Sequence, residues 1–208
     1  MSGRLVIFGR FLGGSESAVN SVAYLLTTAL GRHAAQRGWD LELIVPYSLV
    51  ITAHELGVAT RGVGSGPGTV WEQTALPPLR KSGVVAGFFN TVPVYGKGYV
   101  TMLHDAHVFT TPKSYLRHRR YWRQLLSKRA GIEGNYVFTV SQHSRNELVR
   151  LGLSTAERIG IVPTGTGAVT TAKPDERVWA RLGLDPKKDA YAMAISSALP
   201  HKNTALLL

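Results

Sequence analysis

Short apolar runs and amphipathic stretches alternate along most of this chain. The apolar runs have strand length and are bounded by glycine, proline or polar residues. We expect strands over residues 4–11, 40–46, 84–92, 98–105, 135–141 and 158–165. The stretches between them carry apolar residues at helical spacing, and we expect helices over residues 18–38, 70–83, 114–130 and 142–153. We predict that Gly38 caps the first helix and that Pro77 and Pro78 break the second.

This alternation predicts the α/β class, with a Rossmann-like, doubly wound parallel sheet covered by helices on both faces. We place this first domain at residues 1–167. Residues 168–188 are polar and contain two prolines, so they are expected to form a linker with a short helix. Residues 189–208 are expected to begin a second Rossmann-like domain, with a strand over 191–200 and a helix from 201. Because that helix pattern stops on three leucines, we expect the second domain to be truncated.

The composition describes a basic globular chain. The 24 Lys and Arg residues against 13 Asp and Glu residues give a net charge of +11, which favours anionic partners such as phosphorylated molecules, anionic lipid or nucleic acid. The chain has no cysteine, which excludes disulfides and thiolate metal sites. It has no uninterrupted apolar run long enough to span a membrane, and the run near Met1 is too short for a signal sequence. We therefore expect a cytoplasmic protein.

A polar cluster follows the expected strand at residues 98–105. His104 and Asp105 fall at its carboxyl end, the edge where ligands bind in open α/β sheets. An imidazole and a carboxylate can bind sugar hydroxyls, which is the interpretation that we favour. A strand-capping structural histidine is the second interpretation. A metal site would need His107 and the distant His143 as further ligands, and we expect no metal.

Two glycines, Gly13 and Gly14, lie between the first strand and the first helix. Free amides at a helix start bind phosphate, and residues without side chains permit close approach. An ordinary tight strand–helix turn is the interpretation that these residues favour on their own. The spacing lacks the three glycines of the dinucleotide fingerprint, so we expect no NAD.

The helix expected over residues 114–130 is strongly basic. We predict that Tyr115, Trp122 and Leu126 share one face, which packs on the sheet. Arg119, Arg120 and Arg123 are predicted to share another face and to meet anionic lipid headgroups. Nucleic acid could use the same arginines, but the sequence contains no recognised nucleic-acid-binding motif, so we expect no nucleic acid.

The order of motifs resembles the N-terminal half of retaining glycosyltransferases of the GT-B fold, specifically family 4. "VWEQTALPPLRKSG" also resembles a helix of its mannosyltransferase-like members. The stretches that carry the resemblance are "GGSES" at 13–17, "VTMLHDAHVF" at 100–109, "VFTVSQHSRNELVRLGLSTAERIGIVPTGTG" at 137–167 and "ISSALPHKNTALLL" at 195–208.

The resemblance implies roles for particular residues. His104, with Asp105 beside it, would act at the catalytic centre by touching the transferred sugar, and His107 would shape the loop. The residues implied in binding substrate or phosphate are Gly13, Gly14, Ser15, Thr164, Gly165 and Lys202. Ser196 and Ser197 replace a Gly-Arg pair of the family, which removes one cation. The family's two-glutamate donor motif is also missing, so we expect the chain to be inactive alone.

The resemblance thus implies a hexosyltransferase that transfers a sugar from a nucleotide sugar, such as GDP-mannose, to a lipid-linked or polysaccharide-precursor acceptor with retention. The donor is a substrate, and no cofactor is expected. Such an enzyme would work in the cytoplasm, peripherally on the inner face of the membrane. The alternative is a non-catalytic, basic Rossmann-like module that binds anionic lipid or nucleic acid.

Overall fold

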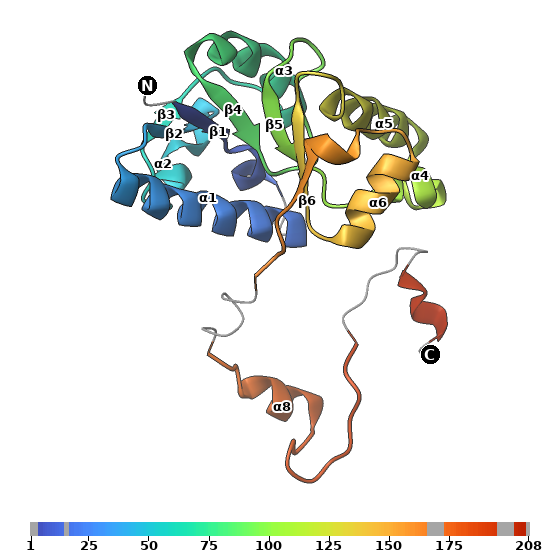
Figure 1. The fold of residues 1–208 in the computed structure, drawn as a ribbon. Coiled ribbons are helices and arrows are strands. Elements are labelled where there is room, and N and C mark those ends of the chain that lie inside the picture. Colours follow the sequence, from blue (N-terminus) through green and yellow to red (C-terminus); the bar gives the residue numbers. More distant parts are fainter. Residues whose placement is uncertain (1–3, 15–16, 166–172, 195–201, 207–208) are drawn as a thin grey trace. The chain divides into compact units, whose positions relative to one another are not determined.

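A parallel sheet forms the centre of the first of two units, Met1–Pro163 and Thr164–Leu208. The computed structural model describes residues 4–14, 17–165, 173–194 and 202–206. Within these residues the sheet has seven strands in the order β3-β2-β1-β4-β5-β6-β7, all paired in parallel (Figure 1). The strands are β1 Leu5–Phe8, β2 Leu41–Val45, β3 Thr60–Gly62, β4 Val84–Gly87, β5 Tyr99–Met102, β6 Tyr136–Thr139 and β7 Ile159–Ile161. The predicted α/β class with a Rossmann-like parallel sheet is confirmed.

Helices lie between successive strands, except between β4 and β5, which residues 88–98 connect without a helix. The α-helices are α1 Ala18–Arg37, α2 Val50–His54, α3 Gly68–Leu79, α4 His107–Thr110, α5 Arg117–Ala130, α6 Gln142–Arg150 and, in the second unit, α8 Arg177–Leu182. The 3-10 segments are η1 Arg10–Gly13, η2 Tyr47–Leu49, η3 Arg80–Ser82, η4 Pro112–Ser114, η5 Ala156–Arg158 and η7 Thr204–Leu206. Gly38 caps α1 in the left-handed conformation at φ +63°, as predicted.

The prolines of α3 do not break the helix, which corrects the prediction. Pro77 and Pro78 lie inside α3, which continues to Leu79. Both prolines fall in the last turn, so each removes one N–H donor to the preceding turn but few helical residues follow them. The helix also buries Trp71 and Leu76 completely in the core, and this packing outweighs the lost hydrogen bonds.

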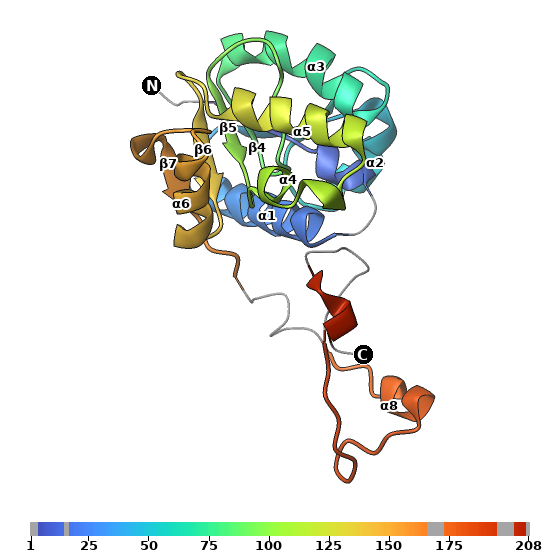
Figure 2. The ribbon, with the colours of Figure 1, turned by 90° about the vertical axis from the view of Figure 1, so that its right-hand side faces the viewer.

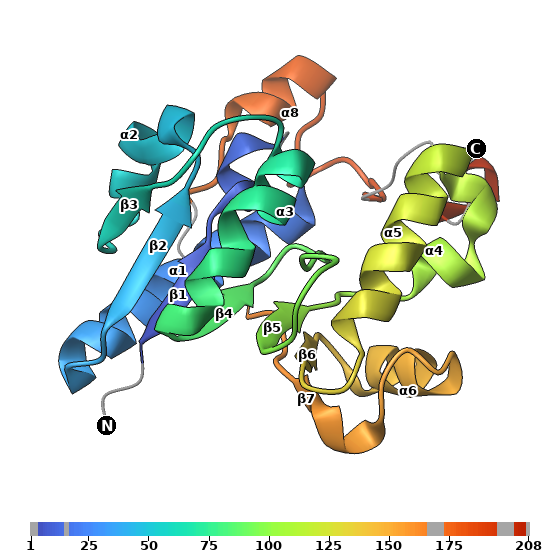
Figure 3. The same ribbon diagram turned by 90° about the horizontal axis from the view of Figure 1, so that it is seen from above.

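Two hydrophobic cores cover the two faces of the sheet. Because side chains alternate along a strand, Val6 and Phe8 of β1 join the core beneath α3, α5 and α6, while Ile7 joins the core beneath α1 and α2. Figures 2 and 3 show α1 on one face and α3 with α5 on the other. The sheet is therefore buried on both faces, as expected for a doubly wound fold.

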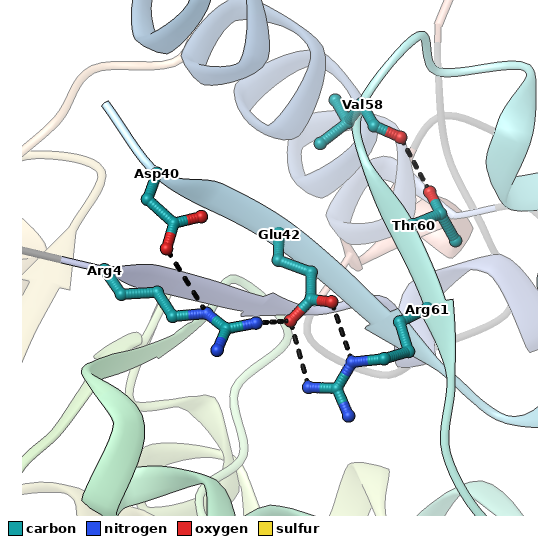
Figure 4. A network of polar contacts seen from close by, with 6 residues as sticks. All are labelled: Arg4, Asp40, Glu42, Val58, Thr60 and Arg61. Carbon is teal, nitrogen blue, oxygen red and sulfur yellow. Dashed lines mark hydrogen bonds and ion pairs between the residues drawn. The ribbon is translucent and has the colours of Figure 1, made fainter. Parts of the chain in front are cut away.

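The edge strand β3 was not predicted from the sequence. Its three residues are polar or glycine, so they show no apolar strand pattern. They form a strand because they pair with β2, which is not adjacent to them in the sequence. Figure 4 shows Glu42 of β2 between Arg4, which precedes β1, and Arg61 of β3. Arg61 donates from Nε to Oε1 of Glu42 over 2.7 Å, and this contact is the first cause of the lowered pKa of Glu42. The network ties the first three strands together.

The second unit contains the predicted short helix, α8, within the expected linker. The strand expected over 191–200 is wrong for residues 191–194, which form no strand and are exposed. A strand needs a neighbour to pair with, and these four residues have none. Residues 195–201 lie outside the described residues. Throughout the described ranges, no helix is both long and apolar enough to cross a bilayer.

Candidate functional site

A pocket of about 570 Å³ opens where β1, β4 and β5 end. Its lining also includes the first turns of α1 and α3 and one side of α5. The lining residues are Arg10, Ser17, Val19, Thr69, Phe89, Asn90, Thr91, Asp105, Val108, Tyr115, Arg119, Trp122, Arg123, Leu126 and Ser127. The sheet reverses its winding between β1 and β4, and this switch point at the carboxyl edge is where ligands bind in such folds.

Asn90, just after β4, shapes the floor of the pocket. Its backbone adopts φ +56°, in the left-handed region that asparagine tolerates better than most residues. Its Oδ1 accepts a hydrogen bond from the backbone N–H of His104 over 2.7 Å, and its own N–H donates to Met102 over 3.0 Å. Asn90 therefore fixes the loop after β4 against the end of β5.

His104 is buried, with 8% of its surface exposed, and it does not line the pocket. Its Nε2 lies 3.1 Å from the backbone oxygen of Phe88. Because a carbonyl oxygen only accepts, Nε2 carries the proton in this contact. Burial lowers the pKa of His104, while the Phe88 carbonyl and the charge of Asp105 oppose the shift. The ring is therefore neutral near pH 7, and contact with a sugar would have to use its remaining atoms.

Asp105 does line the pocket and is exposed. Its Oδ1 accepts a hydrogen bond from the backbone N–H of His107 over 2.9 Å, at the start of α4. Its Oδ2 lies 3.6 Å from Nδ1 of His107. Asp105 therefore offers a carboxylate to the pocket while it holds the turn into α4, and His107 belongs to that turn.

One side of α5 forms a wall of the pocket, and it combines aromatic rings with cations. Trp122 and Leu126 lie on this side of α5 together with Arg119 and Arg123, and Tyr115, which precedes the helix, lines the pocket beside Arg123. The prediction that these arginines occupy a separate face is therefore wrong for both, because positions four and seven residues apart lie on one side of a helix.

The polar groups of this wall differ in their partners. Arg123 lies over the Tyr115 ring, 5.7 Å from its centroid. The indole N–H of Trp122 is buried and has no hydrogen-bond partner among the described residues. Arg120 lies outside the pocket lining and over the Tyr121 ring, at 4.8 Å. The pocket therefore presents flat rings and two cations on a single wall, with the indole N–H of Trp122 buried behind it.

A buried ion pair under the pocket was not found from the sequence. Arg10 Nη1 donates to Oε2 of Glu72 over 2.6 Å, and Thr91 donates to Oε1 over 2.6 Å. Glu72 is fully buried, and burial raises its pKa to about 7, with the charge of Arg10 as the strongest opposing effect. An acidic residue inside the apolar stretch of α3 was the only available signal.

The predicted glycine loop lies in η1 and just after it, outside the pocket lining. Gly13 and Gly14 are exposed, and neither has a positive φ. A Cβ atom at Gly14 would lie 2.9 Å from Nδ2 of Asn20, a side chain that can move. Ser15 lies outside the described residues. Phosphate binding by this loop stays a prediction.

The other predicted substrate residues, Thr164, Gly165 and Lys202, belong to the second unit and are exposed. Every residue of the pocket lining belongs to the first unit, so the structure does not include these three in the pocket. Their binding roles stay predictions. Among the residues that the structure describes, no three His, Asp or Glu side chains come together in an arrangement that could hold a metal.

The fold and pocket define a Rossmann-like α/β protein with a basic, aromatic-lined pocket at its sheet switch point. No protein-family model matches the chain, and no curated protein matches it either. The functional argument therefore rests on the residues of the pocket.

Proposed function

We propose that this chain is the acceptor-binding part of a glycosyltransferase that uses a nucleotide sugar. In this proposal the pocket binds a phosphate-bearing saccharide, such as a lipid-linked polysaccharide precursor. The transferred sugar is a hexose, with mannose from GDP-mannose as the first candidate, and its anomeric configuration is retained. The family resemblance of the sequence motifs supplies the reaction class.

The observation that carries the proposal is the mixture of groups around the pocket. Sugar rings pack their C–H faces on flat aromatic side chains, which Tyr115 and Trp122 supply. Hydroxyl groups need short polar partners, and Asp105 and Asn90 supply acceptors and donors. An anionic phosphate would be attracted by the arginines of the lining. A site built for a purely apolar ligand would have no use for these charged groups.

Phosphate recognition matches the charge of the pocket. Arg10, Arg119 and Arg123 face Asp105 as the one carboxylate of the lining. Arginine binds phosphate ester oxygens through two parallel, charge-assisted hydrogen bonds. A diphosphate leaving group is stabilised in the same electrostatic way, so the reaction needs no obligatory metal.

We also propose that α5 carries the contact with an anionic membrane surface. Because Arg119 and Arg123 line the pocket, we assign the membrane contact to the side of α5 that faces away from the pocket and to the residue just before the helix. There Leu116 and Tyr121 expose 62% and 57% of their surfaces beside the exposed Arg117. Amphipathic helices of this kind bind headgroups through cations and acyl chains through apolar residues. Such a contact would bring a lipid-linked acceptor close to the pocket.

Transfer assays on the protein encoded by the complete gene test the proposal. Radiolabelled nucleotide sugars, including GDP-mannose, are supplied with a polyprenyl-diphosphate saccharide in vesicles that contain anionic lipid. The proposal expects a labelled lipid-linked product with the anomeric configuration of the donor. Hydrolysis or use of nucleotides that carry no sugar, without transfer from any donor of the panel, would exclude it. Tight binding to duplex nucleic acid, without binding to the vesicles, would favour the non-catalytic module.

A further inference from the structure

Arg10 is held more firmly than any other cation of the pocket lining. It follows β1 directly, and its guanidinium donates to Glu72 over 2.6 Å and to Thr69 over 3.0 Å. The same group lies over the Phe89 ring, 5.3 Å from the centroid. These contacts come from two separate segments, α3 and the loop after β4, so the guanidinium has one orientation fixed before any ligand binds.

Gly68 leaves room for the Arg10 side chain. A Cβ atom at residue 68 would lie 2.9 Å from Nε of Arg10 and 3.2 Å from its Cγ. The backbone at Gly68 does not adopt a positive φ, so the glycine is not required by the turn. The absence of a side chain at this position leaves the space in which the Arg10 side chain lies.

The fixed guanidinium still has donors to offer. Arginine has five N–H groups, and two of those in Arg10 are used by Glu72 and Thr69. The residue lines the pocket and leaves 21% of its side chain exposed. A planar guanidinium that lines a cavity and keeps unused N–H groups can donate them to phosphate oxygens.

We propose that Arg10 binds the phosphate group of the pocket's ligand and that Glu72, buried directly behind it, is the residue that positions Arg10 for this contact. The inference deepens the proposed function and rests on it, since it assumes that the pocket holds a phosphate-bearing saccharide. Arg119 and Arg123 then add attraction from the opposite wall.

Glu72 also couples this contact to a proton. Its carboxyl group contacts the guanidinium of Arg10, which lies in η1, and the hydroxyl of Thr91, which follows β4. The other charged residues of the pocket lining are Asp105, Arg119 and Arg123. A hydroxyl can donate to a carboxylate or accept from a carboxylic acid, so Thr91 satisfies Glu72 in both states. A phosphate on Arg10 adds negative charge near Glu72 and favours the protonated state. Binding therefore takes up a proton.

Calorimetric titration of the 208-residue chain tests this inference. The probes are glucose 1-phosphate and farnesyl diphosphate, at about pH 6 and about pH 8, in buffers of different ionisation enthalpy that reveal proton uptake. We expect tighter binding at the lower pH, with net proton uptake. The probe that binds more tightly shows whether the phosphate belongs to a soluble sugar phosphate or to a prenyl carrier. Binding of either probe that depends on Arg10 supports the proposed contact between Arg10 and phosphate.

Matched variants separate positioning from folding. Arg10→Lys keeps the charge but loses the planar fork, and we expect about tenfold weaker binding. Gly68→Ala changes no charge, yet it displaces the guanidinium and should weaken binding by a similar factor. Glu72→Gln should remove the proton uptake, and Glu72→Asp should restore part of it. Arg32→Ala, at an exposed arginine of α1 outside the lining, is the control and should bind as the wild type does.

Two results would overturn the inference. One is unchanged affinity in both Arg10→Lys and Gly68→Ala, with circular dichroism that shows native folding. The other is undiminished proton uptake in Glu72→Gln. If Glu72→Gln does not fold, the affinities of Arg10→Lys and Gly68→Ala decide. Because these titrations need no sugar transfer, Arg10-dependent binding without transferase activity would reject only the proposed function, and transfer that is insensitive to Arg10→Lys would reject only this inference.

Discussion

The ring Nε2 of His104 lies 3.1 Å from the backbone carbonyl oxygen of Phe88 and links the ends of two neighbouring parallel strands. The N–H of the same residue is bound by Asn90, so both the backbone and the ring of His104 are engaged by the loop that follows β4. This loop also supplies Phe89, Asn90 and Thr91 to the pocket. His104 therefore supports the shape of the pocket from behind, and its substitution is expected to affect folding and ligand binding together.

Replacing His104 by alanine leaves the Phe88 carbonyl buried without its donor. We expect the free energy of unfolding to fall by about 1–3 kcal/mol. Burial lowers the pKa of His104, so the stability that it contributes is present above about pH 6.5 and is lost as the pH falls through the lowered value. Urea unfolding at several pH values measures both effects. Native stability combined with loss of the sugar transfer proposed above would instead assign His104 a direct catalytic role.

Glu72 has the opposite dependence on pH. Its pKa rises from 4.5 to about 7 on folding, so the folded state binds the proton more tightly. The stability from this group is fully present below pH 4.5 and is lost as the pH rises through about 7. Relative to Glu72→Gln, the wild type should lose about 3 kcal/mol over this window. If the free energy of unfolding changed equally with pH in the two proteins across this window, the assignment would be contradicted.

Trp122 should report directly on the ligand. Its indole N–H is buried without a partner among the described residues, and its ring lines the pocket. We expect glucose 1-phosphate to change the tryptophan fluorescence, and we expect Trp122→Phe to abolish most of that change. Trp122→Ala should weaken binding about tenfold, the effect of losing an aromatic contact of about 1.5 kcal/mol. Trp39→Phe, at an exposed tryptophan outside the lining, is the control.

Arg119 and Arg123 should affect ligand affinity more than membrane affinity. Each arginine replaced by alanine is expected to weaken phosphate binding severalfold, with the loss becoming smaller at high salt because these side chains are exposed. Co-sedimentation with anionic vesicles should change less in these variants than in a Leu116→Ala and Tyr121→Ala double variant. Greater loss of vesicle binding in the arginine variants would restore the original lipid-facing interpretation.

Patterns within single elements predicted most of the fold. The apolar runs at β1, β2, β4, β5, β6 and β7 have strand length, and Gly38 is the residue type that ends a helix in the left-handed conformation. The strand β3 was not predicted because its three residues carry no apolar pattern. They form a strand through pairing with β2 and through the Glu42–Arg61 ion pair. Strand propensity is a property of such neighbours as much as of the residues.

The candidate site was predictable only in part for the same reason. Asp105 and the wall of α5 lie within regions that the sequence singled out, because strand ends and charged helices are visible locally. The pair of Arg10 and Glu72 joins residues 62 positions apart, and no local pattern relates them. The mixed wall of Trp122 and Arg119 depends on the rotation of α5 about its axis, which is set by packing on the sheet.

Nuclear magnetic resonance offers the most direct test that this pocket binds a phosphate-bearing saccharide. The labelled chain is titrated with glucose 1-phosphate, and the backbone amide shifts are followed. The account predicts saturating shifts at Asn90, Thr91, Asp105 and Trp122, which require about tenfold more ligand in Arg10→Lys. Shifts confined to residues outside the pocket lining, or no shifts at millimolar ligand, would contradict it.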